Sequence, residues 1–516
     1  MTKPWPRTST SGLTVCGPTK LKGGAVAFRD LRDYLAALDR EGEVQHIEEE
    51  VDWDLEVGAV IRRSYDLRAA APIFENIKGY PVGYRIFGAP AGLSRPGREY
   101  ARIALALGMG PETGVGALIE EYIRRKKSPI NPIIVANGPC KENILMGDRV
   151  DLLELPVPLL HDGDGGRYIG TWHLVVTRDP DTGWTNWGMY RLMVHDATSM
   201  GGLVAPSQHI GMMYYQKYEA RNQPMPFAVV IGTEPLSSLV AATYLPTGVN
   251  EADITGGLRG EPLELVKCET VDLEVPAAAE IVIEGEMLPY ERRDEGPFGE
   301  YTGYRSAHAG SPKPVYRVKA ITHRNDPIMP VSCMGVPVDD AHATMSVTVA
   351  GELLDDLRCR GFPVRMVALP PQCAQSMAVV STRTPYPYFA KKVAHAIWAS
   401  QAGAVLYWVM VVDEDVDATN LDEVLHAVVT RCHPDRGVHK VPNAPIYPNL
   451  STFTDPDDRL AGRGACCLLD ATWPKHWHPE DTPVKASFTV MWPREIQDLV
   501  LRKWEKYGYE GGLPRV

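Results

Sequence analysis

Short apolar runs interrupted by glycine and proline fill the middle of this chain of 516 residues, between about residues 131 and 330. Ile133 to Val135, Thr171 to Thr177 and Phe227 to Ile231 are such runs. Runs of this length that are rich in Val, Ile and Thr are typical of strands, because Gly and Pro end regular elements. The pattern predicts a central β domain, for which a barrel is one possible form.

The segment before this region has a mixed pattern. Apolar side chains recur at helical spacing before Gly42, namely Phe28, Leu31, Tyr34, Leu35 and Leu38. The run from Val44 to Val51 then predicts a strand, so residues 26–130 are expected to form an α/β domain. Residues 1–25 are rich in Pro, Thr, Ser and Gly, which is typical of a flexible tail.

The segment after about Pro330 returns to alternating strands and helices. Val409 to Val412 has the length of a buried strand, and residues 417–420 can cap a following helix. The apolar face expected for that helix consists of Leu421, Val424, Leu425 and Val428. Residues 331–516 are therefore predicted to form a separate α/β domain that includes a terminal helix.

Composition narrows the possible function. A net charge of -12 argues against general affinity for nucleic acid or for an anionic membrane, so a small-molecule partner is favoured. No apolar run is long enough to span a membrane. The nine cysteines form no CxxC pair, and only Cys466 and Cys467 are adjacent. We therefore expect a cytoplasmic protein without a disulfide framework or a thiolate zinc site.

Two carboxylates lie close together in Glu295-Gly-Pro-Phe-Gly-Glu300. The glycines and the proline do not allow an ordinary helix here, so a loop presents the two acids. Two neighbouring carboxyl groups cannot both ionise freely, and one of them can remain protonated and donate a proton. This pattern indicates acid-base chemistry, and the alternative is a solvated turn.

A second group of candidate residues lies in the central region. Asn186, His209 and Glu251 together offer an amide oxygen, an imidazole and a carboxylate. This mixed set suits Mn²⁺ or Mg²⁺ completed by phosphate oxygens better than it suits structural zinc. Arg191 can clamp a substrate carboxylate. The alternatives are a hydrogen-bonded histidine, a solvated glutamate and a structural arginine.

Several ordered motifs resemble the UbiD family of reversible decarboxylases, and the ferulic acid (cinnamic acid) decarboxylases in particular. The motifs are Pro139-Cys-Lys-Glu-Asn143, Asp151-Leu to Leu155-Pro-Val-Pro158, Trp184-Thr-Asn-Trp187 through Arg191, Gln208-His-Ile210, Lys267-Cys-Glu-Thr270, Glu295 to Glu300 and Trp504-Glu-Lys-Tyr-Gly-Tyr509. They extend over nearly the whole chain after the tail, and together they are far more specific than any one of them.

The resemblance implies a cofactor, prenylated FMN, which a UbiX-type flavin prenyltransferase supplies. It implies that a divalent metal, typically Mn²⁺ (or Mg²⁺), holds the flavin phosphate through Asn186, His209 and Glu251, with K⁺ nearby. The cofactor contacts that it implies are Asn186, Trp187, Gly188, Met189, Tyr190, Arg191, Gln208, His209 and Glu251. The family's catalytic network corresponds to Arg191, Glu295 and Glu300, with Glu300 as the proton donor and Arg191 paired with Glu295.

The resemblance also implies a fold and a reaction. The fold has a central split β-barrel that binds the flavin, between an N-terminal α/β domain and a C-terminal α/β domain that builds the oligomer, a homodimer or alternatively a hexamer. The reaction removes CO₂ from an aromatic, heteroaromatic or α,β-unsaturated carboxylic acid, by cycloaddition or through a quinoid intermediate. Two other functions stay open: a UbiD-like subunit of a larger carboxylase complex, and a flavin oxidoreductase.

Four positions depart from the ferulic acid decarboxylase pattern. Gln401 stands where those enzymes have a lysine that contacts the flavin phosphate. Tyr301 replaces a methionine and Met345 an isoleucine, and Ala444 aligns loosely with a pocket phenylalanine. These changes predict a reshaped pocket for a larger or more polar acid than cinnamate, such as a hydroxylated benzoate or an indole acid. Tyr301 is equally consistent with simple packing against the barrel.

Overall fold

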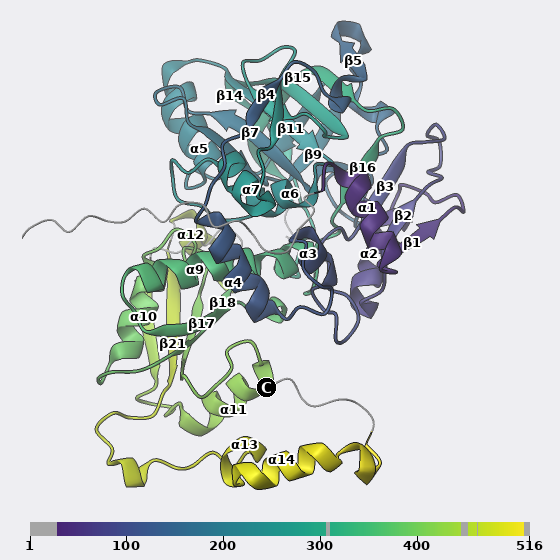
Figure 1. The fold of residues 1–516 in the computed structure, drawn as a ribbon. Coiled ribbons are helices and arrows are strands. Elements are labelled where there is room, and N and C mark those ends of the chain that lie inside the picture. Colours follow the sequence, from purple (N-terminus) through teal and green to yellow (C-terminus); the bar gives the residue numbers. More distant parts are fainter. Residues whose placement is uncertain (1–27, 306–309, 445–451, 462, 510–516) are drawn as a thin grey trace, which may run out of the picture.

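The computed structural model describes residues 28–305, 310–444, 452–461 and 463–509, so the predicted tail over residues 1–25 lies outside the described residues. Figure 1 shows three α/β parts: a large curled sheet at the top, a small N-terminal sheet beside it, and a C-terminal sheet below. This structure confirms the prediction of a multidomain α/β protein with a central β domain.

The N-terminal sheet combines segments from distant parts of the chain. Its strand order is β1-β2-β3-β16, where β16 returns from beyond the central sheet to pair in parallel with β3. The strands are β1 (Val44–Ile47), β2 (Ala71–Phe74), β3 (Arg85–Gly88) and β16 (Ile328–Val331). The helices α1 (Leu31–Arg40), α2 (Glu56–Leu67) and α3 (Ala101–Ala106) accompany this sheet. The next helix, α4 (Val115–Lys126), packs instead against α7 (Glu251–Arg259) and α9 (Thr348–Cys359).

The central sheet has nine strands in the order β6-β9-β10-β15-β14-β11-β7-β8, with β5 paired to β15. Its first strands are β5 (Asn143–Met146), β6 (Tyr168–Gly170), β7 (His173–Arg178), β8 (Thr185–Gly188) and β9 (Leu192–Asp196). The others are β10 (Ser199–Gly202), β11 (Met225–Ile231), β14 (Ile281–Glu295) and β15 (Ser311–His323). Val175 and Val229 on paired strands are fully buried, as expected for a sheet that is covered by other elements.

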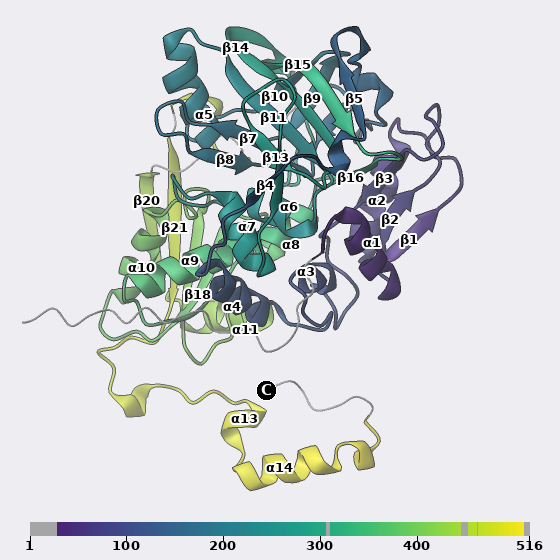
Figure 2. The same ribbon diagram turned by 45° about the horizontal axis from the view of Figure 1, so that its top comes forward.

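Helices and a small sheet cover the central sheet (Figure 2). The helices are α5 (His209–Met213), α6 (Pro235–Ala241) and α7 (Glu251–Arg259). The small sheet consists of β4 (Ile133–Val135), β12 (Glu264–Lys267) and β13 (Glu274–Pro276). Asn250 caps α7 by accepting a hydrogen bond from Ala252 N, and this cap begins the helix at Glu251.

The C-terminal part is a five-stranded sheet in the order β17-β18-β19-β21-β20. Its strands are β17 (Val364–Ala368), β18 (Met377–Thr382), β19 (Trp408–Asp413), β20 (Val438–Ala444) and β21 (Gly464–Ala471). Its helices are α8 (Asp340–Met345), α9 (Thr348–Cys359), α10 (Phe389–Trp398), α11 (Leu421–Arg431) and α12 (Pro456–Leu460). A terminal arm carries α13 (Phe488–Met491) and α14 (Arg494–Lys503), which lie apart from the rest of the chain in Figures 1 and 2.

Two local predictions need correction. The strand expected from Val44 to Val51 ends at Ile47, because the three glutamates that follow are exposed; Val51 forms only an isolated bridge with Ile77. In α11, Val424 and Ala427 are buried, but Leu425 is 48% exposed. The predicted cap of α11 is confirmed, since the Asn420 side chain accepts hydrogen bonds from Asp422 N and Glu423 N.

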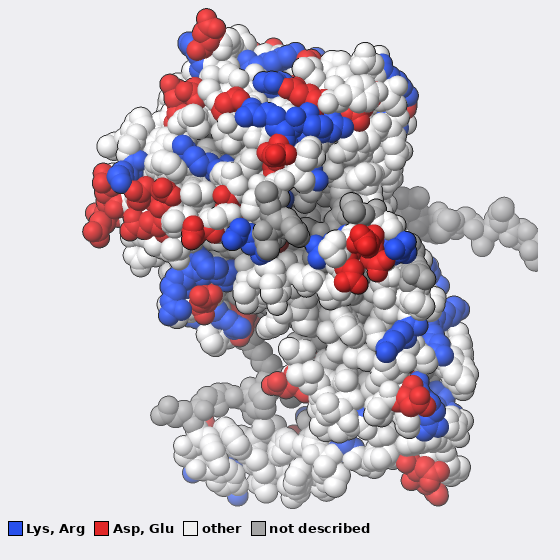
Figure 3. Space-filling model, turned by 180° about the vertical axis from the view of Figure 1, so that it is seen from behind, with Lys and Arg blue, Asp and Glu red and all other residues white. Residues whose placement is uncertain are grey.

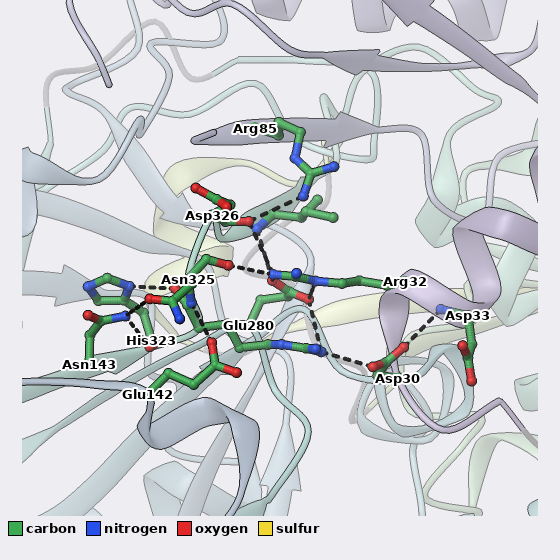
Figure 4. Close-up of polar contacts among 12 residues, drawn as sticks. Asp30, Arg32, Asp33, Arg85, Glu142, Asn143, Glu280, His323, Asn325 and Asp326 are labelled. Carbon is green, nitrogen blue, oxygen red and sulfur yellow. Dashed lines mark hydrogen bonds and ion pairs between the residues drawn. The ribbon is translucent and has the colours of Figure 1, made fainter. Parts of the chain in front are cut away.

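A polar cluster joins α1 to the central sheet (Figure 4). The Glu280 side chain is fully buried and accepts two hydrogen bonds of 2.8 Å from Arg32 Nε and Nη2. Ile328 N donates to the same carboxylate at 3.1 Å, and Arg324 Nη1 lies 3.4 Å from it. Because a buried carboxylate needs such partners, this cluster fixes the N-terminal sheet against the central one.

We expect Arg32→Ala to lower the free energy of unfolding by about 2–3 kcal/mol, because it leaves Glu280 buried with one fewer cation. The loss should be smaller than for a fully buried pair, since Arg324 remains close. Urea denaturation followed by circular dichroism measures it. Arg29→Ala is the control: Arg29 precedes α1 and forms a solvent-exposed pair with Asp33 in the first turn of the helix, and its removal should leave the midpoint unchanged. Equal midpoints for both variants would contradict the role of the cluster.

The surface shown in Figure 3 carries both signs of charge side by side rather than one extended basic area. Pairs such as Arg317 with Glu291 and Lys319 with Glu286 cross between β14 and β15. Among the described residues no helix is long and apolar enough to cross a membrane. The eight cysteines in the described part of the chain are free thiols.

Candidate active site

The loop after β14 brings its two carboxylates to one place. Glu295 ends the strand, and Gly296 has a φ of +85°, a conformation that glycine adopts without strain. A Cβ atom at Gly296 would also lie only 3.3 Å from Arg191 Nη2. Glycine therefore lets the loop turn close to Arg191 and place Glu300 beside Glu295.

Arg191 lies between the two acids, just after β8. Its Nε and Nη2 donate to the two oxygens of Glu295 at 2.9 and 2.8 Å, and its Nη1 donates to Glu300 Oε1. The Tyr168 hydroxyl donates to Glu295 Oε1 at 2.8 Å. Glu295 thus accepts three hydrogen bonds from Arg191 and Tyr168, an environment suited to a carboxylate, whereas the same guanidinium gives Glu300 one.

Burial distinguishes the two carboxyl groups further. It raises the pKa of Glu300 above its usual range; Arg191 opposes this shift, while the charge of Glu295 adds to it. Burial alone would lower the pKa of Arg191, but Glu300 and Glu295 outweigh it and raise that pKa, so the guanidinium stays charged. The arrangement can therefore hold a proton on Glu300 beside a fixed ion pair.

Two His–Asp pairs, His161 with Asp164 and His342 with Asp339, hold the backbone on either side of Glu300. Asp164 Oδ1 accepts a hydrogen bond of 2.9 Å from Gly299 N, and Asp164 Oδ2 lies 2.8 Å from His161 Nδ1. On the other side, His342 Nε2 donates to Tyr301 O at 2.7 Å. Fixed peptides before and after Glu300 restrict where its carboxyl group can lie.

The ring of His161 is held in its charged form. Its Nδ1 faces Asp164, and its Nε2 lies 2.8 Å from Met334 O and 3.3 Å from Cys333 Sγ. Burial favours the neutral ring, but the hydrogen bonds with Asp164 and Cys333 outweigh it and raise the pKa of His161 to about 10. Both nitrogens can then donate, which a neutral imidazole cannot do.

Neither pair was predicted from the sequence, although local signals for both exist. His161 and Asp164 belong to the glycine-rich run His161-Asp-Gly-Asp-Gly-Gly166, which predicts a tight turn with polar side chains. Asp339 is the N-cap of α8 and forms a capping box with His342. These local patterns predict a turn and the start of a helix. They do not predict that either element contacts the loop around Glu300.

The three predicted metal ligands lie together. Asn186 Oδ1 is 2.9 Å from His209 Nδ1, and Glu251 Oε2 accepts a hydrogen bond of 2.9 Å from Trp187 N. If His209 Nδ1–H donates to Asn186, His209 Nε2 stays available as a ligand, 3.1 Å from Thr247 Oγ1. Burial lowers the pKa of His209 and raises that of Glu251 to about 8.

No group of three or more His, Cys, Asp or Glu in the described ranges could hold a metal ion by itself. The predicted metal site contains only two residues of these types, His209 and Glu251, because its third ligand is the amide of Asn186. A metal here would therefore need further oxygen ligands from a bound molecule.

One cavity of about 370 Å³ connects the two groups of residues. Nearly all the predicted site residues line it: Asn186, Trp187, Gly188, Met189, Tyr190, Arg191, Gln208, His209, Glu251 and Glu300, and the pocket residues Tyr301, Met345 and Gln401. Glu295 lies behind Arg191, with 2% exposure. The volume falls in the range typical of cofactor and ligand sites.

Ala444 is the exception among the predicted pocket residues. It is not among the described residues that line the cavity, and it packs instead in a small buried cluster with Tyr407 and Cys466 at the end of β20. A role of Ala444 in the substrate pocket therefore stays a prediction.

Comparison with known families identifies the class of enzyme. Models of the three domains of 3-octaprenyl-4-hydroxybenzoate carboxy-lyase match this chain: the N-terminal domain at residues 35–122, the Rift-related domain at 133–337 and the C-terminal domain at 342–471. The protein is therefore a carboxy-lyase. The chain belongs to the UbiD family, which confirms the resemblance found in its motifs.

Curated relatives support the same class. The chain is 36% identical to pyrrole-2-carboxylic acid decarboxylase of Pseudomonas aeruginosa over 492 residues, which cover 93% of this chain and 98% of that protein. It is 33% identical to ferulic acid decarboxylase 1 of Saccharomyces cerevisiae over 498 residues, with 93% and 98% covered. The enzyme class, a decarboxylase, follows from these matches.

Solved structures of similar fold include vanillic acid decarboxylase of Sedimentibacter hydroxybenzoicus in closed form. It has a TM-score of 0.83 and 31% identity, with 93% of this chain and 99% of that chain covered. An evolved dimeric form of the UbiD-class enzyme HmfF from Pelotomaculum thermopropionicum, in complex with prFMN, has a TM-score of 0.74 and 30% identity. That match covers 88% of this chain and 97% of the other.

Proposed function

We propose that this protein is a non-oxidative, reversible decarboxylase that uses prenylated FMN to release CO₂ from an aromatic, heteroaromatic or α,β-unsaturated carboxylic acid. The observation that carries the proposal is the Glu300–Arg191–Glu295 network at the wall of a cofactor-sized cavity. The prFMN bound to HmfF and the decarboxylase names of the relatives support it.

The residues at the cavity suit the flavin. Asn186 to Arg191, Gln208, His209 and Glu251 line one continuous surface and would hold it, and Asn186, His209 and Glu251 would bind Mn²⁺ (or Mg²⁺) together with its phosphate. Burial keeps much of the Glu251 carboxyl protonated without a cation, and a divalent ion would favour its charged form. K⁺ belongs to the proposal through the family resemblance.

When bound, prenylated FMN supplies the electron sink that takes up the electron pair left by departing CO₂. The protein's own residues orient the substrate and handle the proton. Arg191 carries a fixed positive charge at the cavity wall and can direct the substrate carboxylate. Glu300 then gives its proton to the carbon that lost CO₂, while Glu295 and Tyr168 hold Arg191 in place. Carboxylation at high bicarbonate is the same reaction reversed.

The rate should depend on pH through Glu300. Burial raises its pKa, so the protonated, active form persists above the usual carboxyl range, and kcat should fall as pH rises through the raised pKa. Initial rates of CO₂ release at saturating acid, measured across pH in one buffer series, report this limb. A kcat that rises steadily toward alkaline pH would contradict the assignment of Glu300 as the proton donor.

Finer features of the architecture belong to the same proposal. We infer that the curled sheet is a split β-barrel that holds the flavin, that residues 26–130, 131–330 and 331–516 are the domains, and that the protein works in the cytoplasm. We also infer a homodimer, with a hexamer as the alternative. The terminal arm supports association, because Met491 and Trp492 on it are 54% and 50% exposed.

The direct test is mass spectrometry of the cofactor released from protein co-expressed with a UbiX-type prenyltransferase, together with CO₂ release from a panel of acids. Prenylated flavin and CO₂ from one class of acid are expected. Plain FMN or no flavin, without CO₂ from any acid, would favour a subunit of a larger carboxylase complex. Reduction of the flavin by a nicotinamide cofactor would favour an oxidoreductase.

A further inference from the structure

The turn at residues 161–166 does more than reverse the backbone, because its polar side chains form a continuous series of hydrogen bonds across the site. Asp164 Oδ1 accepts a hydrogen bond of 2.9 Å from Gly299 N, the residue before Glu300. Asp164 Oδ2 lies 2.8 Å from His161 Nδ1, and His161 Nε2 lies 2.8 Å from Met334 O. Met334 lines the cavity, so the series connects the loop of the proton donor to the cavity wall.

The same loop packs directly on the ring of His161. A Cβ atom at Gly299 would lie 2.7 Å from two atoms of this ring, so a larger residue there would displace the loop or the ring. The ring of Phe298 meets that of His161 edge-on, with 5.7 Å between the centroids. Phe298 in turn lies under the guanidinium of Arg191, at 5.4 Å. One imidazole therefore supports the segment that leads to Glu300 and contacts Arg191.

Burial indicates that the turn is fitted to this loop. The Asp164 side chain has no exposed surface, and a buried carboxylate is costly unless its oxygens accept hydrogen bonds. A turn can supply such donors from its own backbone, yet Asp164 Oδ1 accepts from an amide 135 residues away. Gly165 N likewise donates to Pro297 O at 2.8 Å. These contacts hold the loop of the proton donor rather than the turn alone.

We propose that His161 and Asp164 are positioning residues, which hold the Glu300 carboxyl at the distance from the substrate at which it can give its proton. This inference rests on the proposed function and deepens it. Glu300 and Arg191 act on the substrate, whereas the pair acts through the backbone before Glu300 and through Met334. Because proton transfer requires hydrogen-bond distance, a small displacement of the loop slows this step more than it weakens binding.

Two variants break the series of hydrogen bonds and a third preserves it. Asp164→Ala removes the acceptor for Gly299 N, and the side chain in His161→Gln cannot contact Asp164 and Met334 O at once. Asp164→Asn keeps an oxygen for Gly299 N and gains an amide that can donate to His161 Nδ1. The imidazole is then neutral, and its Nε2–H still donates to Met334 O. His46→Gln is the matched control, because His46 forms a comparable pair with Glu75 on the exposed face of the N-terminal sheet.

Kinetics of CO₂ release by the flavin-loaded enzyme should separate these variants. We expect kcat to fall about 10- to 100-fold in Asp164→Ala and His161→Gln, to stay within about threefold of wild type in Asp164→Asn, and to be unchanged in His46→Gln. KM should change less than about threefold throughout. The solvent isotope effect on kcat should rise in the two slow variants, because proton transfer becomes slower relative to the other steps.

A smaller amount of folded enzyme would lower kcat without changing the solvent isotope effect, so this ratio distinguishes positioning from a loss of structure. An equal loss of kcat in Asp164→Asn and Asp164→Ala would overturn the inference. A lower kcat with the isotope effect of wild type would overturn it as well.

Hydrogen–deuterium exchange makes the test independent of turnover. Exchange of the peptide at residues 295–303, measured by mass spectrometry on the full chain, should be at least about tenfold faster in Asp164→Ala and His161→Gln. It should match wild type in Asp164→Asn and His46→Gln. Unchanged exchange in both broken variants would overturn the inference. If wild type releases no CO₂ from any acid, the proposed function fails, and the exchange still decides whether the pair holds the loop.

Discussion

Replacing Glu300 by glutamine should lower the rate of CO₂ release about 100- to 10,000-fold while the protein still binds its flavin. Glutamine keeps the size of the side chain and can still accept a hydrogen bond from Arg191 Nη1, but it has no acidic proton to give. Burial raises the pKa of the native Glu300 carboxyl, which favours the protonated form that can donate. The glutamine variant has no such form. Single-turnover assays of CO₂ release, with flavin content measured by absorbance, separate the chemical step from cofactor binding.

A matched control uses Glu264→Gln, because Glu264 is an exposed carboxylate on β12, away from the lining of the cavity. It should retain full activity. Full activity in Glu300→Gln would remove Glu300 as the proton donor and direct attention to another acid or to water. Loss of flavin in Glu300→Gln would instead show that the loop supports the cofactor.

Loss of Glu251 is the second large effect that we expect. Glu251→Gln and Glu251→Ala should both weaken metal binding at least about 100-fold and lose flavin together with the metal, because the carboxylate supplies the only anionic protein ligand of the proposed set. The glutamine variant still can accept a hydrogen bond from Trp187 N, so it preserves the local fold. Metal analysis by mass spectrometry and flavin absorbance of the purified variants measure both losses.

Asp253→Asn is the control for Glu251, since Asp253 lies in the first turn of the same helix and does not line the cavity. It should keep both metal and flavin. If Glu251→Gln also retains both at the level of wild type, the phosphate must be held without this carboxylate. The assignment of Asn186, His209 and Glu251 as the metal site would then fail.

The amino-acid sequence by itself determined the family and indicated the candidate acid-base residues. Glu295 and Glu300 could be recognised because glycine and proline force a loop between them, and this local constraint does not depend on distant contacts. The helix at Leu421 could be predicted for the same reason, since Asn420 caps it locally. Motif order then related Arg191 to the two acids.

Only the tertiary structure decided how those residues are supported and what shares their cavity. β16 joins the N-terminal sheet although it follows the central one, and no local pattern encodes such a long-range pairing. Asp164 contacts the Glu300 loop from 135 residues earlier in the chain, and His342 contacts it from 41 residues later. Gln375, from the C-terminal part, lines the same cavity. Hydrophobic periodicity and turn residues specify elements, whereas burial, hydrogen bonding and pKa values at a site arise from the packing of distant elements against one another.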